Sequence, residues 1–177
     1  MSGKPESGAP SSGLRIPKAL TEKLINGELQ LGQFLGMTRE RLFGYAAIGH
    51  KMLQAGRTRL ALDIFQGLVA ASPKEPAFLT QLGATFLTLE RTDEAFDAYQ
   101  RALAVDASNG DALVGRGELL LRRGNIPEGL KDLSRAIELD PSLKKRSTQR
   151  ARTTLLALKT QAEQIKGKGR PASSPKK

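Results

Sequence analysis

Apolar and polar positions repeat along this chain with a period of 34 residues. Gly49, Gly83 and Gly117 mark the period, and counting from seven residues before each divides residues 42–143 into three frames: 42–75, 76–109 and 110–143. An internal repeat of this length indicates a stack of similar structural units. Further columns align between the frames: Tyr45, Leu79 and Leu113 at position 4; Ile48, Leu82 and Arg116 at position 7; Met52, Phe86 and Leu120 at position 11; Ala61, Ala95 and Gly129 at position 20; Phe65, Tyr99 and Leu133 at position 24; Leu68, Ala102 and Ala136 at position 27; Pro73, Ala107 and Pro141 at position 32.

Each frame predicts two short helices. Positions 4, 7 and 11 form one mainly apolar stripe at helical spacing, and positions 20, 24 and 27 form a second. The breaks between them fall at residues 54–56, 89–91 and 123–125. A glycine inside a helix costs about 1 kcal/mol relative to alanine. A glycine at position 8 of every frame therefore predicts a close helix crossing, where it meets the small residue at position 20 and the large residues at positions 11 and 24 fill the space beside it.

This pattern resembles the tetratricopeptide repeat, a helix–turn–helix unit of 34 residues, across residues 42–143. The resemblance implies an all-α solenoid, in which three repeats stack into a right-handed superhelix with a concave face. Arg116 at an apolar position, Gly129 in place of alanine and Ala107 in place of proline depart from the family pattern. Because one unit cannot bury its own apolar face, the two ends of such a stack need caps.

The segments on either side of the repeats are predicted to supply these caps. Residues 18–37 form a leading helical segment, interrupted at Asn26-Gly27, whose leucines must bury against the first repeat or against another copy. A homodimer through this segment is therefore a prediction. Residues 144–166 predict a basic capping helix, with the apolar stripe Leu143, Ala151, Leu155, Leu158, Ala162 and Ile165. Residues 1–17 and 167–177 are poor in apolar side chains and are expected to be disordered.

The charge of the chain is concentrated at one end. The net charge is +10, and residues 144–177 carry eleven basic side chains and one acidic side chain. Such a tail suits an anionic partner, either nucleic acid or a membrane surface. The alternative is a solvated end that keeps the protein in solution.

No catalytic or cofactor motif stands out. The chain has no cysteine and one histidine, and it contains neither a G-x-S-x-G elbow nor a phosphate-binding G-x-x-x-x-G-K-[ST] loop. Gly115-Arg116-Gly117 lies inside an expected helix, where it is predicted to serve packing. We therefore expect a protein that is not an enzyme and uses no cofactor or metal. Without a long apolar run or a signal-like start, it is expected to be cytoplasmic.

A binding surface is predicted on the concave face of the stack, at positions 2, 5, 9 and 12 of each frame. These positions share one side of the first helix in each pair. Spaced apolar groups on such a face suit an extended peptide. The candidate groove residues are Phe43, Ala46, His50, Leu53, Ala77, Thr80, Ala84, Leu87, Val114, Glu118 and Leu121, with Asp111 at the acidic end.

A narrower resemblance spans about residues 24–143. Its elements are Gly36-Met37-Thr38 leading into Leu42 and Tyr45, then Gly56, Ile64 to Leu68, Leu82-Gly83-Ala84, and Glu118-Leu119-Leu120 before Gly124. This order is similar to the chaperones of type III secretion translocators. It implies a cytoplasmic chaperone that holds an extended segment of a hydrophobic secreted client in its groove. Two alternatives stay open: a general tetratricopeptide scaffold in another assembly, and a nucleic-acid-associated protein acting through the basic tail.

Overall fold

The computed structural model describes residues 17–168, with side-chain surroundings up to Ile165, and every regular element in this range is a helix. The expected all-α class is confirmed. In chain order the elements are α1 (Lys18–Ile25), α2 (Leu31–Phe34), α3 (Arg39–Gln54), α4 (Thr58–Ala71), α5 (Pro76–Thr88), α6 (Thr92–Val105), α7 (Gly110–Arg122), α8 (Ile126–Leu139) and α9 (Arg146–Lys168).

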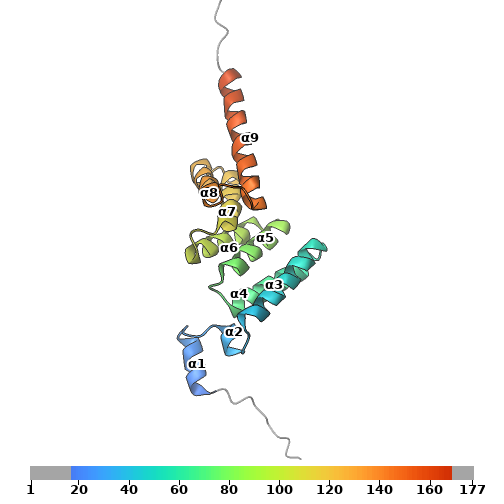
Figure 1. The fold of residues 1–177 in the computed structure, drawn as a ribbon, viewed down its shortest axis with the longest axis vertical. Coiled ribbons are helices and arrows are strands. Elements are labelled where there is room, and N and C mark those ends of the chain that lie inside the picture. Colours follow the sequence, from blue (N-terminus) through green and yellow to red (C-terminus); the bar gives the residue numbers. More distant parts are fainter. Residues whose placement is uncertain (1–16, 169–177) are drawn as a thin grey trace, which may run out of the picture.

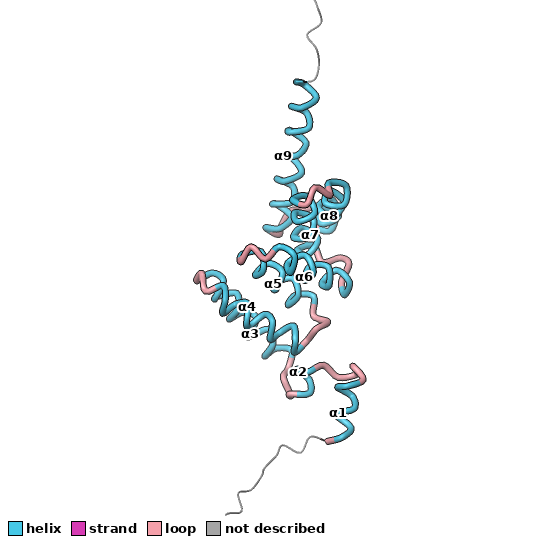
Figure 2. The backbone as a smooth tube through the Cα atoms, turned by 180° about the vertical axis from the view of Figure 1, so that it is seen from behind, coloured by secondary structure: helices cyan, strands magenta, loops and turns pink. Residues whose placement is uncertain are grey.

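The helices form a stack of pairs. Figure 1 shows α3 with α4, α5 with α6, and α7 with α8 following one another along the long axis, with α1 at one end and α9 projecting from the other. The view from behind shows the short loops that join the two helices of each pair (Figure 2). The expected disorder of residues 1–16 and 169–177 lies outside the described residues. Helix α9 continues to Lys168, two residues past the expected end of the capping helix.

The turns inside the three pairs use the same backbone geometry. Gly56, Glu90 and Gly124 hold equivalent places and have φ angles of +72°, +60° and +79°. This left-handed region is open to glycine and costly for residues with a Cβ atom. Side chains cap two of the helices that begin a pair: the Thr38 hydroxyl accepts from the Arg41 amide at 3.3 Å, and the Asn109 carbonyl accepts from the Ala112 amide at 3.0 Å.

The repeated glycines lie at the helix crossings, but the expected contact with the small residue at position 20 is shown for Gly117 alone, and Gly49 and Gly83 meet the ring at position 24. A Cβ atom at Gly49 would stand 2.9 Å from the Phe65 ring, and one at Gly83 would stand 2.8 Å from the Tyr99 ring. At Gly117 it would stand 3.1 Å from the carbonyl oxygen of Gly129. In each pair, the glycine of the first helix thus admits the second helix to a distance at which a Cβ atom would be in tight contact.

Tyr99 also joins the second pair to the third. A Cβ atom at Gly115 would lie 2.3 Å from Tyr99 Cζ, so the ring fills a space that is open only because residue 115 has no side chain. Burial of the ring raises the pKa of the Tyr99 hydroxyl. Both glycines of Gly115-Arg116-Gly117 therefore serve packing, as expected.

Arg116 has a partner that the sequence pattern did not reveal. Its guanidinium forms two hydrogen bonds to the Asp132 carboxylate, at 2.7 and 2.9 Å. Asp132 is buried, and the carboxylate raises the pKa of Arg116. The equivalent positions of the second pair hold Leu82 and Ala98, both buried. The third pair thus replaces an apolar contact with an ion pair at the same place.

The leading segment only partly covers the first pair. Helix α2 packs on α4 so closely that a Cβ atom at Gly32 would lie 2.9 Å from the Ala71 carbonyl oxygen, and Ser72 donates to the Gln30 side chain at 2.7 Å. The expected interruption is present at Gly27, where φ is +72°. Helix α1 has no buried residue. Burial against the first repeat therefore holds for α2 and not for α1.

The C-terminal helix closes the other end of the stack. Ala151 and Thr148 of α9 are fully buried against the third pair. The Asp140 carboxylate holds the start of α9, because it accepts from the Thr148 hydroxyl at 2.6 Å and from the amides of Lys145 and Lys144 at 2.9 and 3.1 Å. Arg152 and Lys159 remain exposed, so the helix presents basic groups outward as expected.

Candidate peptide-binding surface

The predicted groove residues come from α3, α5 and α7. Phe43 and His50 are exposed. Seven others are half-buried: Ala46, Leu53, Ala77, Ala84, Leu87, Glu118 and Leu121. The predicted positions thus differ in what they can offer to a ligand.

Two of the predicted residues are inaccessible. Val114 is 0% exposed and Thr80 is 6% exposed. The Thr80 hydroxyl donates to the Pro76 carbonyl oxygen at 2.8 Å within its own helix. The prediction that these two residues face a client is wrong, because both side chains are buried.

The third repeat contributes less than its sequence indicates. Leu121 lies against Gly129 of α8, where a Cβ atom would be 2.8 Å from the leucine side chain. Glu118 pairs with Arg150 of α9 at 2.6 Å, and Asp111 accepts a hydrogen bond from Ser147 at the start of α9. The acidic end of the predicted groove is therefore bonded to the chain's own C-terminal helix.

The accessible part of the predicted site lies on α3 and α5. We call it the α3–α5 face, and it consists of Phe43, Ala46, His50, Leu53, Ala77, Ala84 and Leu87. On α5 these residues lie on the side opposite the buried Leu82 and Phe86, as helical geometry requires. The face is mainly apolar, and His50 is its one titratable group.

An aromatic cluster stands at one end of this face. The rings of Phe43 and Phe78 have centroids 5.0 Å apart and are tilted by 49°. The Arg39 guanidinium lies 4.9 Å from the centroid of Phe43 and bonds to the Glu75 carboxylate at 3.1 Å. Aromatic and cation–π contacts of this geometry fix a partly exposed ring in place. Phe43 is 37% exposed, so a held aromatic surface remains open to a ligand.

Sequence reasoning did not identify Arg39, Glu75 and Phe78 as members of this cluster. Arg39 precedes the first repeat frame, and Glu75 and Phe78 belong to the junction between two frames. The sequence shows that these residues are aromatic or charged, but it does not show that they lie near Phe43. That proximity depends on how the first two helix pairs pack.

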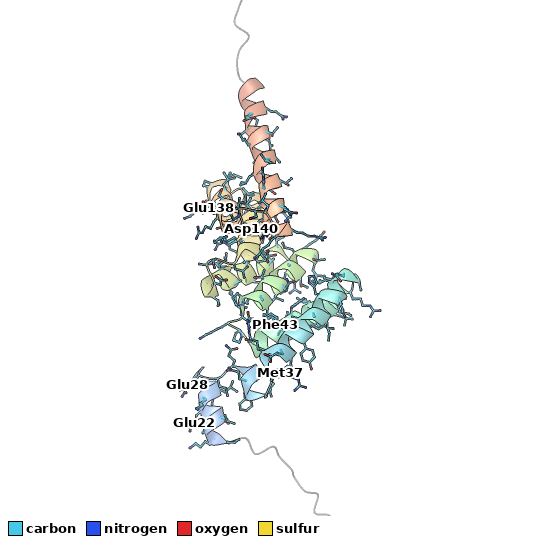
Figure 3. All side chains as sticks on the ribbon, in the orientation of Figure 1. Glu22, Glu28, Met37, Phe43, Glu138 and Asp140 are labelled. Carbon is cyan, nitrogen blue, oxygen red and sulfur yellow. The ribbon has the colours of Figure 1, made fainter. Side chains whose placement is uncertain are left out.

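A small hollow adjoins the cluster. It has a volume of about 340 Å³ and lies between α2, the start of α3 and the loop before α5. Met37, Leu42 and Phe78 give it apolar walls, and the charged residues at its edge are Lys74 and the Arg39–Glu75 ion pair. Figure 3 shows Met37 and Phe43 at this junction of the leading segment with the stack. The hollow thus extends the α3–α5 face toward the leading segment.

A second hollow lies on the other side of α5. It measures about 520 Å³ and is lined by Leu82 and Phe86 together with Val69 of α4 and Ala98 of α6. Glu94, Asp97 and Arg101 also border it. Because Leu82 and Phe86 are less than a tenth exposed, this hollow offers an apolar floor with little accessible area.

The described residues show two further features that bear on function. Among residues 17–165, no group of histidine, aspartate and glutamate side chains is arranged to hold a metal ion. No helix in the described part of the chain combines the length and apolar character needed to cross a membrane.

Known proteins share the sequence pattern of this stack. The family described as "Tetratricopeptide repeat" matches residues 47–112 and 81–144, which together make up more than half of the chain. The small glutamine-rich tetratricopeptide repeat-containing protein 2 of Mycosarcoma maydis is 25% identical over 96 residues, covering 54% of this chain. The match spans 27% of that relative's length.

Solved structures share the fold over a larger part of the chain. A type III secretion complex from Aeromonas hydrophila has a TM-score of 0.69 at 23% identity, covering 83% of this chain and 99% of that chain. The type III secretion translocator chaperone SycD of Yersinia enterocolitica has a TM-score of 0.63 at 21% identity, covering 72% and 97%. SycD in complex with a peptide of the translocator YopD has a TM-score of 0.60 at 22% identity, covering 71% and 97%. The repeat period, the paired helices and the family match together show that this chain belongs to the tetratricopeptide repeat family.

Proposed function

We propose that this chain is a non-enzymatic peptide-binding module that acts as a cytoplasmic chaperone of a type III secretion translocator. An extended segment of a hydrophobic client would lie along the α3–α5 face, and this face would shield the apolar side chains of the client from water. The observation that carries the proposal is the exposed Phe43 ring, held against Phe78 and Arg39 at the end of an apolar face. A protein without a ligand for this face would leave a rigid aromatic surface in water.

The choice of client class is supported by the shared architecture. The Aeromonas hydrophila complex matches the fold over 83% of this chain, and SycD in complex with a translocator peptide matches it over 71%. A client segment with spaced apolar anchors suits the α3–α5 face better than a charged one, because His50 is its only titratable group. The binding region is shorter than three full repeats, since α9 bonds to Glu118 and Asp111.

The test is a binding titration with peptides tiled from the hydrophobic secreted proteins of the source organism. Fluorescence anisotropy at about 300 mM salt removes most of the purely electrostatic contribution. We expect one extended apolar segment to bind, and Phe43→Ala or Leu87→Asp to weaken it at least tenfold. Leu139→Asp is the matched control, because Leu139 is exposed on α8, away from this face. Undiminished binding by both face variants would reject the proposed site, and no binding by any secreted protein would reject the chaperone role.

A homodimer through residues 18–37 remains part of the proposal. Helix α1 has no buried residue, and Leu20, Ile25, Leu31 and Leu35 are exposed. On α3, Tyr45 and Ile48 are 45% and 46% exposed. The equivalent residues of α5, Leu79 and Leu82, are buried beside the preceding pair. A second copy could cover this apolar surface.

The basic end of the chain supports the alternative of nucleic-acid association. Arg146, Arg152 and Lys159 are exposed on α9, and residues 144–177 hold eleven of the basic side chains. Phosphate binding weakens steeply as salt rises, whereas binding of an apolar segment to the α3–α5 face does not. Affinity for a duplex DNA or RNA that is lost between about 50 and 300 mM salt would favour this alternative. Scaffolding in another assembly would instead appear as salt-resistant binding to a protein that is not secreted.

A further inference from the structure

Helix α9 continues well beyond the part of the stack that it caps. It has 23 residues, against 14 in α8, and it projects from the end of the molecule (Figure 1). Its early residue Ala151 is fully buried, and Leu155 packs against the core. The same apolar stripe continues through Leu158 and Ala162 to Ile165, which is 66% exposed. The cap therefore uses only the first part of an apolar face that runs further.

This unused stripe forms one wall of a hollow with α8. We call it the α8–α9 hollow, and its volume is about 420 Å³. Its apolar lining consists of Ile126, Leu130, Leu155, Leu158, Ala162 and Ile165. From Leu155 to Ile165 the helix rises about 15 Å, at 1.5 Å per residue. That length accommodates about three turns of a second helix, with one apolar anchor for each turn.

The charges at the hollow are unequal. Lys159 borders one side and the uncharged Gln161 borders the other. Arg152 lies on the same stripe as Lys159, seven residues earlier, and both are exposed. Glu163, one turn after Lys159, is the only acidic residue of residues 144–177. Of the residues that line the hollow, Lys159 is the only charged one, so the charge at its edge is positive.

This combination selects among occupants. A second copy of α9 would bring the same positive charge to the contact and be repelled. Nucleic acid would satisfy Arg152 and Lys159 but leave the apolar lining in water. Helix α9 contains no aromatic residue, which membrane-surface helices use to anchor themselves. An amphipathic helix with acidic residues beside its apolar stripe would satisfy both the lining and the charge.

We propose that the α8–α9 hollow docks an acidic amphipathic helix of a protein partner. The partner helix lies beside α9, places apolar side chains between Leu158, Ile165 and Ile126, and directs carboxylates toward Lys159 and Arg152. This surface is separate from the α3–α5 face and lies at the opposite end of the stack. A client and a second protein can therefore be bound at the same time, whatever the client is.

The test uses a defined probe, an 18-residue stapled helix with leucine at positions 4, 8, 11 and 15 and glutamate on both flanks. A second peptide has lysine in place of every glutamate. Binding to the full-length chain is measured by fluorescence anisotropy at about 150 mM salt. We expect the acidic peptide to bind at least tenfold more tightly than the lysine peptide, and Lys159→Glu to reduce that preference.

Matched variants of α9 locate the site. Ile165→Asp places a charge in the hollow and should weaken binding of the acidic peptide at least tenfold. Because Ile165 is exposed, the fold should stay intact. Thr160→Asp is the control, because Thr160 is exposed, lies on the opposite face of the same helix from the apolar stripe, and is not three or four residues from Arg152 or Lys159. Binding by this control should equal that of the unmodified chain. Circular dichroism melting confirms that both variants remain folded.

Three outcomes would overturn the proposal. Equal affinity for the two peptides would show that charge does not select the partner. Binding that survives Ile165→Asp would place the peptide elsewhere. Preferential binding of a 20-base-pair duplex, or of vesicles containing phosphatidylglycerol, lost with Lys159→Glu but not with Ile165→Asp, would identify the end of the stack as an anion-binding surface instead.

Discussion

At the scale of single residues, the absence of a side chain is the main determinant of how the helices pack. Gly49, Gly83 and Gly117 each lie against the second helix of their own pair, and Gly115 makes room for Tyr99 between two pairs. The loss of helix propensity at each glycine is about 1 kcal/mol. Closer packing of the large neighbouring side chains offsets it.

This predicts opposite effects for two glycine substitutions. Gly115→Ala should destabilise the protein by about 1–3 kcal/mol, because the added methyl would overlap the Tyr99 ring, only 2.3 Å away. Gly44→Ala on α3 is the control, since nothing lies within 4 Å of a Cβ atom there. It should stabilise the protein by up to about 1 kcal/mol. Urea unfolding followed by circular dichroism measures both, and equal effects would contradict the proposed role of Gly115.

A second prediction concerns the ion pair of the third repeat. Arg116→Ala should cost about 2–3 kcal/mol, because it leaves the buried Asp132 carboxylate without its partner. The double variant Arg116→Leu with Asp132→Ala recreates the Leu82–Ala98 arrangement of the second repeat and should be close to neutral. Urea unfolding of the single and double variants compares them. A double variant as unstable as the single one would show that the third pair has no room for the apolar contact.

At the scale of elements, the start of α9 is held by a residue that lies outside the helix, Asp140. Hydrogen bonds from the Thr148 hydroxyl and the Lys145 amide hold the pKa of Asp140 below its ordinary value. These bonds need the ionised carboxylate. A carboxyl group with a lowered pKa in the folded state contributes stability above its unfolded pKa and loses it as pH falls through the folded pKa.

The bonds to Asp140 therefore predict a pH-dependent difference in melting temperature between an Asp140 variant and the unmodified protein. Asp140→Asn should lower the melting temperature at about pH 7, where the native carboxylate is ionised. The difference in melting temperature between this variant and the unmodified protein should become smaller as pH falls below about 4, the ordinary pKa range for aspartate. Asp63→Asn, at an exposed position of α4, serves as the control and should show no such difference. A difference that stays constant down to about pH 2 would exclude Asp140 ionisation as its cause.

At the scale of the whole molecule, the two ends of the stack differ in how completely they are closed. Helix α9 covers the third pair, and Ala151 is fully buried there. Within residues 17–168, α2 packs on α4 of the first pair, and Tyr45 and Ile48 of α3 stay about half exposed. A solenoid leaves such a face open unless something covers it, because each repeat buries its apolar surface on its neighbours.

The open end predicts a change of mass with concentration. Light scattering at about 50 µM should give twice the chain mass of 19.1 kDa. Ile25→Asp and Ile48→Asp should each return the mass to that of one chain without loss of helical content. Leu139→Asp, at the other end, should leave the dimer unchanged. A single-chain mass for the unmodified protein at this concentration would count against dimerisation through the leading segment.

The sequence by itself determined the fold, because the apolar periods and the 34-residue spacing are local properties that survive without any knowledge of contacts. It determined the helix pairs and the crossing glycines. It did not reveal that Val114 and Thr80 are covered, that Arg116 reaches Asp132, or that α9 bonds to Glu118. Each of these depends on the distance and rotation between neighbouring helices, which side-chain packing sets. The tertiary structure alone therefore decided how much of the predicted groove stays open, and it brought Arg39, Phe43 and Phe78 together from separate segments.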